Sequence, residues 1–277
     1  MPRHSTATLA TATLADLSAA LALGLSATPA AAAVCVGACG VAGANGDVTA
    51  PPTSATYGWI STAGGVDGAG QLAVGGTNGS SFTTSAFTAA AGDNLRYYFN
   101  FISSDGQSAP GAFIYEDYAF VQLLDAATDS PVAMLFNART EPDVLTVPGS
   151  GLDPISPGVT LTPPSSSIQI GTGAGGGPLW APLGGDSGSC WGPGCGYTGW
   201  IRSDFQVANA GSYRLKFGVS NWGDTAYQTG LAYDGLSIGG HEIGEGVPEP
   251  ASWALMILGF GGVGALLRRR REAAVAS

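Results

Sequence analysis

The strongest local pattern along the chain is an alternation of apolar and polar residues with a period of two. In residues 94–102 and again in residues 212–220, every second side chain is aromatic or aliphatic, and Arg214 and Lys216 occupy the opposite face of the second segment. Such alternation is typical of a strand with one buried face. Five further segments also predict strands, namely 80–88, 117–124, 131–138, 199–207 and 229–238. Strands separated by turn residues, with no helical period outside the termini, predict an antiparallel β-sandwich of the jelly-roll kind.

Three places interrupt this pattern. Asp234-Gly235 breaks the alternation between Tyr233 and Leu236, which predicts a β-bulge in the last strand. Residues 144–164 are rich in proline and glycine and predict a long surface connection, and residues 171–196 are richer still in glycine. A loop of that length inside a compact domain is usually functional or disordered.

The N-terminus has the composition of a secretory signal peptide, which we assign to residues 1–33. An apolar stretch is followed by Ala31-Ala32-Ala33, an A-x-A site with cleavage before Val34. A lipoprotein signal ending at Cys39 is the alternative interpretation. We therefore expect the secretion translocon and a signal peptidase as partners, and we expect residues 34–246 to form one exported domain.

The C-terminus carries a second targeting signal. Pro248-Glu249-Pro250 precedes an apolar run, residues 251–267, and four arginines follow that run directly: Arg268, Arg269, Arg270 and Arg271. As a helix this run rises about 25 Å, at the short end for a membrane span. Arginines beside a span stay in the cytoplasm. We therefore expect one transmembrane helix, with residues 272–277 as a short cytoplasmic tail and the upstream chain outside.

Residues 247–271 resemble the PEP-CTERM sorting signal in its PEPxxWA form. The resemblance rests on the tripeptide, on Trp253 and Ala254, on the glycines of the short apolar run and on the arginine cluster. It implies that an exosortase of a polysaccharide-producing Gram-negative bacterium recognises the tail and cleaves near Pro248-Glu249-Pro250. It also implies an inner-membrane intermediate and delivery to the cell surface or the extracellular space. An ordinary membrane anchor is the alternative, and it leaves the P-E-P and W-A pattern unexplained.

Composition limits what the exported domain can bind. The chain of 277 residues has a net charge of −10, and residues 34–246 hold 17 acidic residues against five basic ones. Lys216 is the only lysine. Nucleic acid is excluded as a partner, because neutralising phosphates requires clustered Lys and Arg. The field of the domain also disfavours a polyanionic ligand, whereas it permits a neutral sugar or a divalent cation.

The four cysteines, an even number in an exported chain, predict disulfides. We expect the local pairs Cys35–Cys39 and Cys190–Cys195, because the members of each pair are close in sequence. Pairing between the two groups is the alternative. A zinc site of four thiolates is disfavoured by the loose spacing and by the oxidising compartment.

No catalytic motif comes with the partners that it needs, so the sequence predicts a protein that is not an enzyme. Gly185-Asp186-Ser187-Gly188 is similar to a serine-protease nucleophile segment, but the only histidine of the exported domain is His241. Gly171-x-Gly173-x-x-Gly176 matches the dinucleotide fingerprint without the helix that must follow it. We predict no cofactor and no metal ligands, although the many carboxylates permit a structural Ca²⁺. An extracellular carbohydrate-active hydrolase that uses paired carboxylates is the alternative function.

Aromatic residues in and after the glycine-rich loop are the candidate ligand contacts. Trp180, Trp191 and Tyr197 lie among Gly and Pro, and exposed aromatic rings are one means by which β-sandwiches hold sugars. Trp200 and Trp222 are expected in the core, since large aromatic side chains dominate cores. The sequence therefore predicts a structural or carbohydrate-binding role, with an extracellular polysaccharide as the partner.

The middle of the chain resembles an uncharacterised family of exported proteins that share this tail. The stretches that carry the resemblance are Gly58-Trp59-Ile60-Ser61, residues 75–81 and Asn137-Ala138-Arg139-Thr140. Residues 230–235 resemble the last strand of galactose-binding-like jelly rolls. The resemblance carries no assigned activity, so it implies a fold and an exported location but no functional residues.

Overall fold

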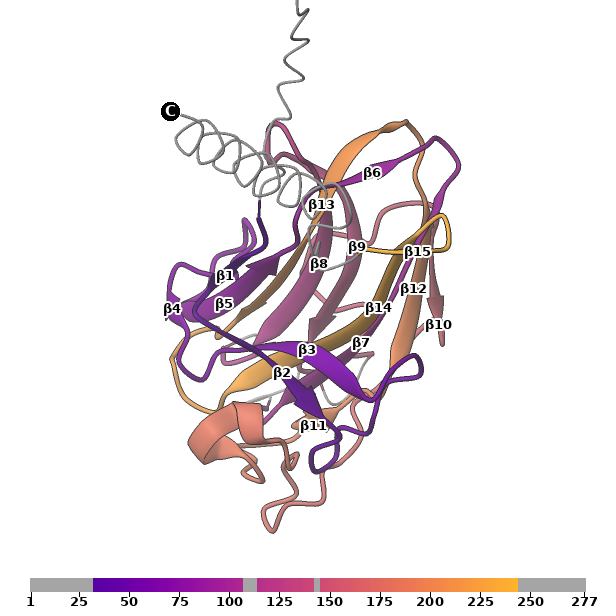
Figure 1. The fold of residues 1–277 in the computed structure, drawn as a ribbon. Helices are drawn as coiled ribbons and strands as arrows, with labels where there is room; N and C mark the ends of the chain where they lie inside the picture. Colours follow the sequence, from indigo (N-terminus) through magenta and orange to yellow (C-terminus); the bar gives the residue numbers. More distant parts are fainter. Residues whose placement is uncertain (1–31, 107–113, 142–144, 244–277) are drawn as a thin grey trace, which may run out of the picture. The chain divides into compact units, whose positions relative to one another are not determined.

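The computed structural model describes residues 32–106, 114–141 and 145–243, and these residues form two antiparallel β-sheets packed as a sandwich (Figure 1). The predicted all-β sandwich is confirmed. The predicted signal peptide and membrane span lie outside the described residues. Within the described ranges, the one helical element is a 3-10 turn, η1 (Ala181–Asp186), and no helix is long and apolar enough to cross a membrane.

The first sheet, called sheet A, has seven strands in the order β1-β5-β13-β8-β9, with β4 paired to β5 and β6 paired to β13. Its strands are β1 (Val34–Val36), β4 (Val66–Asp67), β5 (Asn78–Thr83), β6 (Phe87–Ala89), β8 (Tyr118–Asp125), β9 (Pro131–Arg139) and β13 (Gly211–Ser220).

The second sheet, called sheet B, has eight strands in the order β10-β12-β7-β14-β3-β2, with β11 paired to β7 and β15 paired to β14. Its strands are β2 (Ala38–Gly43), β3 (Thr56–Ser61), β7 (Asn94–Ser103), β10 (Val159–Thr162), β11 (Gly196–Tyr197), β12 (Ile201–Gln206), β14 (Thr229–Ile238) and β15 (His241–Glu242).

The main core lies between the sheets and follows from the predicted alternation. Its central members are Leu95, Tyr97, Phe99 and Phe101 of β7 together with Tyr213, Leu215, Phe217 and Val219 of β13, all buried. Phe217 of sheet A stacks on Tyr233 of sheet B with ring centroids 4.2 Å apart. Full burial of one such side chain contributes about 1.5–3 kcal/mol to folding, so this contact between the sheets is a main source of stability.

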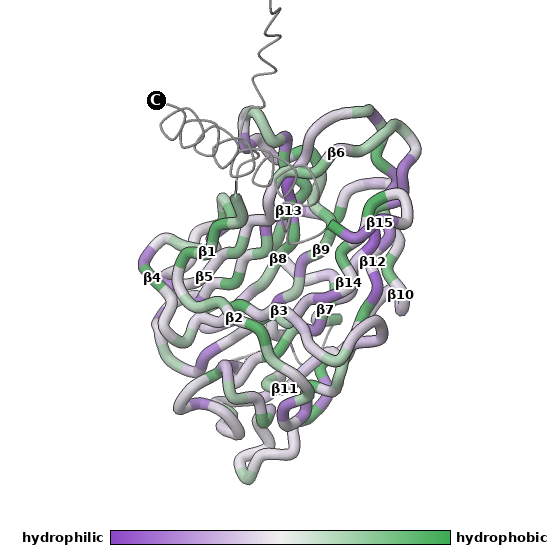
Figure 2. The backbone as a smooth tube through the Cα atoms, in the orientation of Figure 1, coloured by the Kyte–Doolittle hydropathy of each residue, from purple (hydrophilic) through white to green (hydrophobic). Residues whose placement is uncertain are grey.

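Hydropathy along the backbone separates the sandwich from its loops (Figure 2). Hydrophobic and hydrophilic positions alternate along the strands, whereas the loops around β11 are mostly pale because Gly, Ser and Trp have intermediate hydropathy. The loop has few apolar residues and no period of two or 3.6, which is why the sequence alone predicts no strand or helix there.

The predicted strand boundaries differ from the structure in two places. Segment 80–88 is two strands, β5 and β6, because Thr84 interrupts the ladder. The Thr84 N–H donates to the Leu215 carbonyl at 2.9 Å, and the Thr84 hydroxyl accepts the Leu215 N–H at 3.0 Å. The predicted connection 144–164 includes β10, which pairs with β12. The alternation also does not predict β1, which has only three residues, β2, which is rich in Gly and Ala, or β3, where Gly58 separates Tyr57 from Trp59.

The predicted bulge near the last strand is confirmed. The register of β14 against β7 shifts between Asp234 and Ser237. Gly235 at the bulge has a φ of 62°, and a Cβ there would lie 2.9 Å from the Thr53 hydroxyl. The bulge turns the Asp234 carboxylate toward the hydroxyls of Thr53 and Ser54, which both donate to it.

Both predicted disulfides are present, Cys35–Cys39 and Cys190–Cys195, and no cysteine in the described part of the chain is free. Cys35 lies on β1 of sheet A and Cys39 on β2 of sheet B, so the first bond joins the two sheets where the domain begins. Gly37 makes the crossing with a φ of 83°, and a Cβ there would lie 2.3 Å from the Ser80 hydroxyl. Only glycine fits this crossing without displacing β5.

Candidate functional site

The predicted sorting residues lie beyond the described part of the chain, which ends at Ile243. They are Pro248, Glu249, Pro250, Trp253, Ala254, Arg268, Arg269, Arg270 and Arg271. The last described strand, β15, is exposed and pairs with the last two residues of β14, Ser237 and Ile238. Ile243 still donates its N–H to Leu236 at 2.7 Å. In the sequence, four residues, 244–247, separate Ile243 from the tripeptide.

The prediction that Trp180 is an exposed ligand contact is wrong, because its side chain is 0% exposed. The indole N–H donates to the Tyr57 hydroxyl at 2.9 Å, and the ring meets Trp59 edge to face at a centroid distance of 6.4 Å. A Cβ at Gly230 would lie 2.4 Å from the Trp180 ring. The glycines that suggested a surface loop therefore make room for a core tryptophan.

Tyr197 and Trp200 pack against the same cluster as Trp180, and both are half-buried. Trp200 meets Tyr57 edge to face at 5.6 Å and donates its indole N–H to the Thr49 carbonyl at 3.1 Å. The core position expected for Trp200 is thus confirmed in part, since the ring is packed but keeps some exposure. Tyr197 belongs to this packing cluster, which leaves Trp191 as the candidate that reaches solvent most.

Trp222 is likewise a packing residue. It lies against the cluster of Tyr118 and Phe120 on the outer side of sheet A, and the Arg139 guanidinium lies over its ring at 4.9 Å. Arg139 is itself buried and donates to the Glu116 carbonyl at 3.0 Å. This arginine, one of the residues in the stretch 137–140, therefore tethers the segment before β8 to β9.

Trp191 is 40% exposed and lies in the loop that the Cys190–Cys195 disulfide closes. Its backbone N–H donates to the Ser104 carbonyl at 3.1 Å, which fixes the loop to the end of β7. The indole ring meets Tyr115 edge to face at 5.2 Å and lies 6.4 Å from the ring of Tyr227. We call Tyr115, Trp191 and Tyr227 the aromatic patch. Sequence reasoning missed Tyr115, which only the fold brings to this loop.

The backbone at Tyr227 is strained. Its φ is 55°, in the left-handed region where a residue other than glycine costs about 1 kcal/mol or more. Hydrogen bonds hold the residues on both sides, since Ala226 donates to the Asp224 carboxylate at 3.0 Å and Gln228 donates to the Asp186 carboxylate at 3.2 Å. Strain of this kind concentrates at sites that position a ligand, and here it positions a ring of the aromatic patch.

A buried polar network adjoins the patch where β7, β8 and β14 come together. Asp117 accepts the Trp222 N–H at 2.8 Å and the Thr229 hydroxyl at 2.6 Å, and that hydroxyl also lies 2.7 Å from the Ser103 hydroxyl. Ser103 accepts the N–H of Asp105 at 3.0 Å. Asp105 is 1% exposed, and its second carboxyl oxygen has no hydrogen-bond partner among the described residues.

Both aspartates of this network are harder to ionise than usual. Burial raises the pKa of Asp105 to about 8, and the charges of Asp224, Asp186 and Glu116 add to the effect. Burial also raises the pKa of Asp117 well above its ordinary value, and the charge of Asp105 adds to it. Two buried carboxylic acids do not form the accessible pair that a glycosidase requires. In the described ranges, no three His, Cys, Asp or Glu side chains gather in a group that could hold a metal ion.

We expect the free energy of unfolding to fall as the pH rises from about 5 to 8. A carboxyl whose pKa is raised on folding stabilises the fold fully below its unfolded pKa, about 4, and this stabilisation is lost as the pH approaches the folded value. One such proton contributes a slope of up to about 1.4 kcal/mol per pH unit. Asp105→Asn should flatten the slope, which urea unfolding at several pH values measures. Asp67→Asn, at an exposed position, is the control, and an unchanged slope in Asp105→Asn contradicts the expectation.

Comparison with known protein families identifies one region. Residues 246–271 match the family model for the PEP-CTERM protein-sorting motif. The predicted PEP-CTERM signal is thereby confirmed, whereas the resemblance of the middle of the chain to an uncharacterised family stays a prediction. No curated protein and no solved structure matches the chain. The motif supports an exported protein that an exosortase processes and delivers to the cell surface.

Proposed function

We propose that this protein is an exosortase-sorted surface protein whose β-sandwich binds carbohydrate through the aromatic patch. The secretion translocon first carries the domain across the inner membrane, and a signal peptidase removes residues 1–33. The apolar run 251–267 then holds the chain in that membrane as an intermediate, until cleavage near Pro248-Glu249-Pro250 frees the domain. The PEP-CTERM match supports the sorting part of this proposal.

The single observation that supports carbohydrate binding is the exposed, braced ring of Trp191. A sugar ring presents C–H groups on one face, and an aromatic ring that is exposed on one side and packed on the other suits that face. Tyr115 and Tyr227 supply the packing, at 5.2 and 6.4 Å from Trp191. The disulfide that closes the loop and the strained backbone at Tyr227 lower the entropy lost when a ligand is bound.

Polar groups beside the patch suit a neutral, hydroxyl-rich ligand. Asp186 and Asp224 are half-buried near it and bring acceptors for hydroxyl groups. Their negative charge, with 17 acidic residues in the domain, disfavours a densely charged polymer at this position. A neutral extracellular polysaccharide is therefore the proposed ligand, and binding to it would retain the released domain near the cell.

Replacing Trp191 with Ala should weaken retention on the producer's own polysaccharide about five- to thirtyfold, as expected for an aromatic residue that contributes about 1–2 kcal/mol to binding. Affinity electrophoresis through a gel containing that polysaccharide measures the change. Ile170→Ala is the matched control, because Ile170 is 79% exposed and the change also removes exposed apolar surface. If wild type is not retarded by any tested glycan, the domain has a structural role and the patch is not a sugar site.

A further inference from the structure

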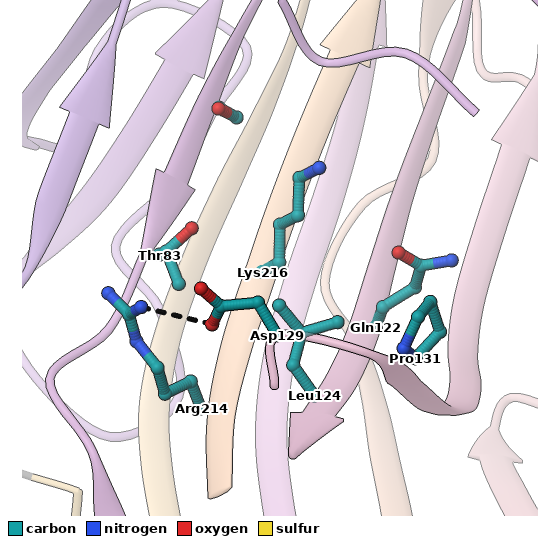
Figure 3. Close-up of a pocket in the computed structure, with 8 residues that line it drawn as sticks. Thr83, Gln122, Leu124, Asp129, Pro131, Arg214 and Lys216 are labelled. Carbon is teal, nitrogen blue, oxygen red and sulfur yellow. Dashed lines mark hydrogen bonds and ion pairs between the residues drawn. The ribbon is translucent and has the colours of Figure 1, made fainter. Parts of the chain in front are cut away.

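A second candidate site lies on the outer face of sheet A, away from the residues of the aromatic patch. A hollow of about 280 Å³ there is lined by Ser81, Thr83, Gln122, Leu124, Asp129, Pro131, Arg214 and Lys216 (Figure 3). These residues come from β5, β8, β13, the turn before β9 and the first residue of β9. The volume is just below the range of about 300–1,000 Å³ for ligand pockets, so the hollow fits one small ring.

Lys216 has no ion pair, in contrast to the four other cations in the described part of the chain. Arg96 and Arg202 pair with Asp204, Arg139 lies 3.8 Å from Glu116, and Arg214 pairs with Asp129 at 3.1 Å. Acidic residues outnumber basic ones by 17 to five in the exported domain. Lys216 is half-buried, and its ammonium lies 5.8 Å from the centre of the Phe120 ring without a carboxylate partner, so it is a candidate anion-binding group.

Neutral polar side chains flank this lysine on both neighbouring strands. The register places Thr83 of β5 and Gln122 of β8 directly opposite Lys216, and Figure 3 shows them on its two sides. Ser81 lies two positions along β5 from Thr83 on the same face. None of these three neutral side chains makes a hydrogen bond to another described residue. Adjacent strands lie about 4.8 Å apart, so the row places neutral donors and acceptors on both sides of the Lys216 side chain.

We propose that this hollow binds a hexuronate, that is, a sugar ring with one carboxylate. Lys216 pairs with the carboxylate, and Ser81, Thr83 and Gln122 bond the ring hydroxyls. A free phosphate needs several donors converging on one tetrahedral group, whereas these groups are spread along a row. The Arg214–Asp129 pair is neutral and borders the hollow, with the Arg214 guanidinium also held by the Thr84 carbonyl at 3.0 Å.

Charge limits the ligand to isolated carboxylates. Arg214 and Asp129 cancel, so the hollow itself carries the single positive charge of Lys216. The acidic residues of the rest of the domain repel a dense polyanion, but salt screens them beyond about 8 Å at physiological ionic strength. The hollow therefore selects a mostly neutral polymer in which single uronate units occur. This site is independent of the aromatic patch, and its failure leaves the function proposed above untouched.

Calorimetric titration of the protein recovered from producing cells tests the proposal. The ligands are the methyl glycoside of glucuronate, its uncharged methyl ester, and inorganic phosphate at the same ionic strength. We expect the glycoside to bind with a dissociation constant of about 1 mM, typical of one small ring with few contacts. Lys216→Gln should weaken that binding about tenfold or more. Arg96→Gln removes the same charge from an exposed ion pair elsewhere and should leave binding within about twofold.

Each result separates the proposal from its alternatives. Binding of the glycoside but not of its ester, lost in Lys216→Gln and kept in Arg96→Gln, supports a uronate site. Equal binding of glycoside and ester overturns it, because the lysine then has no role. Phosphate binding as tightly as the glycoside also overturns it, in favour of a general anion site. Folding of Lys216→Gln is checked by its unfolding midpoint, and Lys216→Arg, which keeps the charge, should retain measurable binding.

Discussion

Changing Pro248-Glu249-Pro250 to three alanines should leave export intact and trap the full-length chain in the inner membrane. An enzyme that cuts beside the membrane needs an extended, unpaired backbone, and proline provides it by removing an N–H donor and disfavouring helix. Alanine, by contrast, favours helix and keeps its N–H donor, so three alanines remove this preference for an extended backbone. We expect loss of most of the processed form, which immunoblotting of membrane and surface fractions measures.

The control for this change lies directly upstream. Changing Gly244 and Glu245 to alanine alters residues before the matched region, 246–271, and leaves that region intact, so processing should continue. Deleting Arg268–Arg271 should instead weaken retention and orientation in the membrane, since arginines beside a membrane span favour the cytoplasmic side. Normal processing of the triple-alanine chain would show that the tripeptide is not what the enzyme recognises.

Replacing Trp180 with Ala should destabilise the domain by about 3–5 kcal/mol, the usual cost of removing a large buried aromatic side chain. The change empties a site that is 0% exposed and removes the partner of the Tyr57 hydroxyl, 2.9 Å away. A hydroxyl left buried without a partner adds to the cost. Urea unfolding followed by tryptophan fluorescence gives the free energy of unfolding.

Trp191→Ala serves as the matched variant for this measurement. Trp191 is 40% exposed, so its loss should change the free energy of unfolding by about 1 kcal/mol or less. The two tryptophans occur 11 positions apart in the same glycine-rich loop. The structure nevertheless buries Trp180 in a core cluster and leaves Trp191 partly exposed at the surface. Equal destabilisation by the two changes would contradict that assignment.

The sandwich could be predicted because its central strands carry the alternation themselves. In β7 and β13 every second residue is a large apolar side chain, and nothing but a strand with one buried face accounts for that spacing. β1 and β2 escaped prediction because their place depends on Gly37 and on pairing with β5 and β3. Glycine at a crossing between sheets has no signature of its own in the sequence.

The site was harder to predict, since burial of a side chain depends on contacts from distant segments. Trp180 has Gly and Pro as sequence neighbours, but Tyr57, Trp59 and Gly230 from β3 and β14 enclose it. Composition around Trp191 is similar, and no distant segment covers it fully. The raised pKa of Asp105 likewise arises from burial and from Asp224, Asp186 and Glu116, which the chain brings together only on folding.

The C-terminal peptide of the native protein, from a strain that carries the exosortase, tests the central claim most directly. Mass spectrometry of the surface-exposed form would identify the last residue of the chain. We expect that form to end near Pro248-Glu249-Pro250, with residues 251–277 missing. A surface form that still ends at Ser277, with the apolar run attached, would contradict the account and make the segment an ordinary membrane anchor.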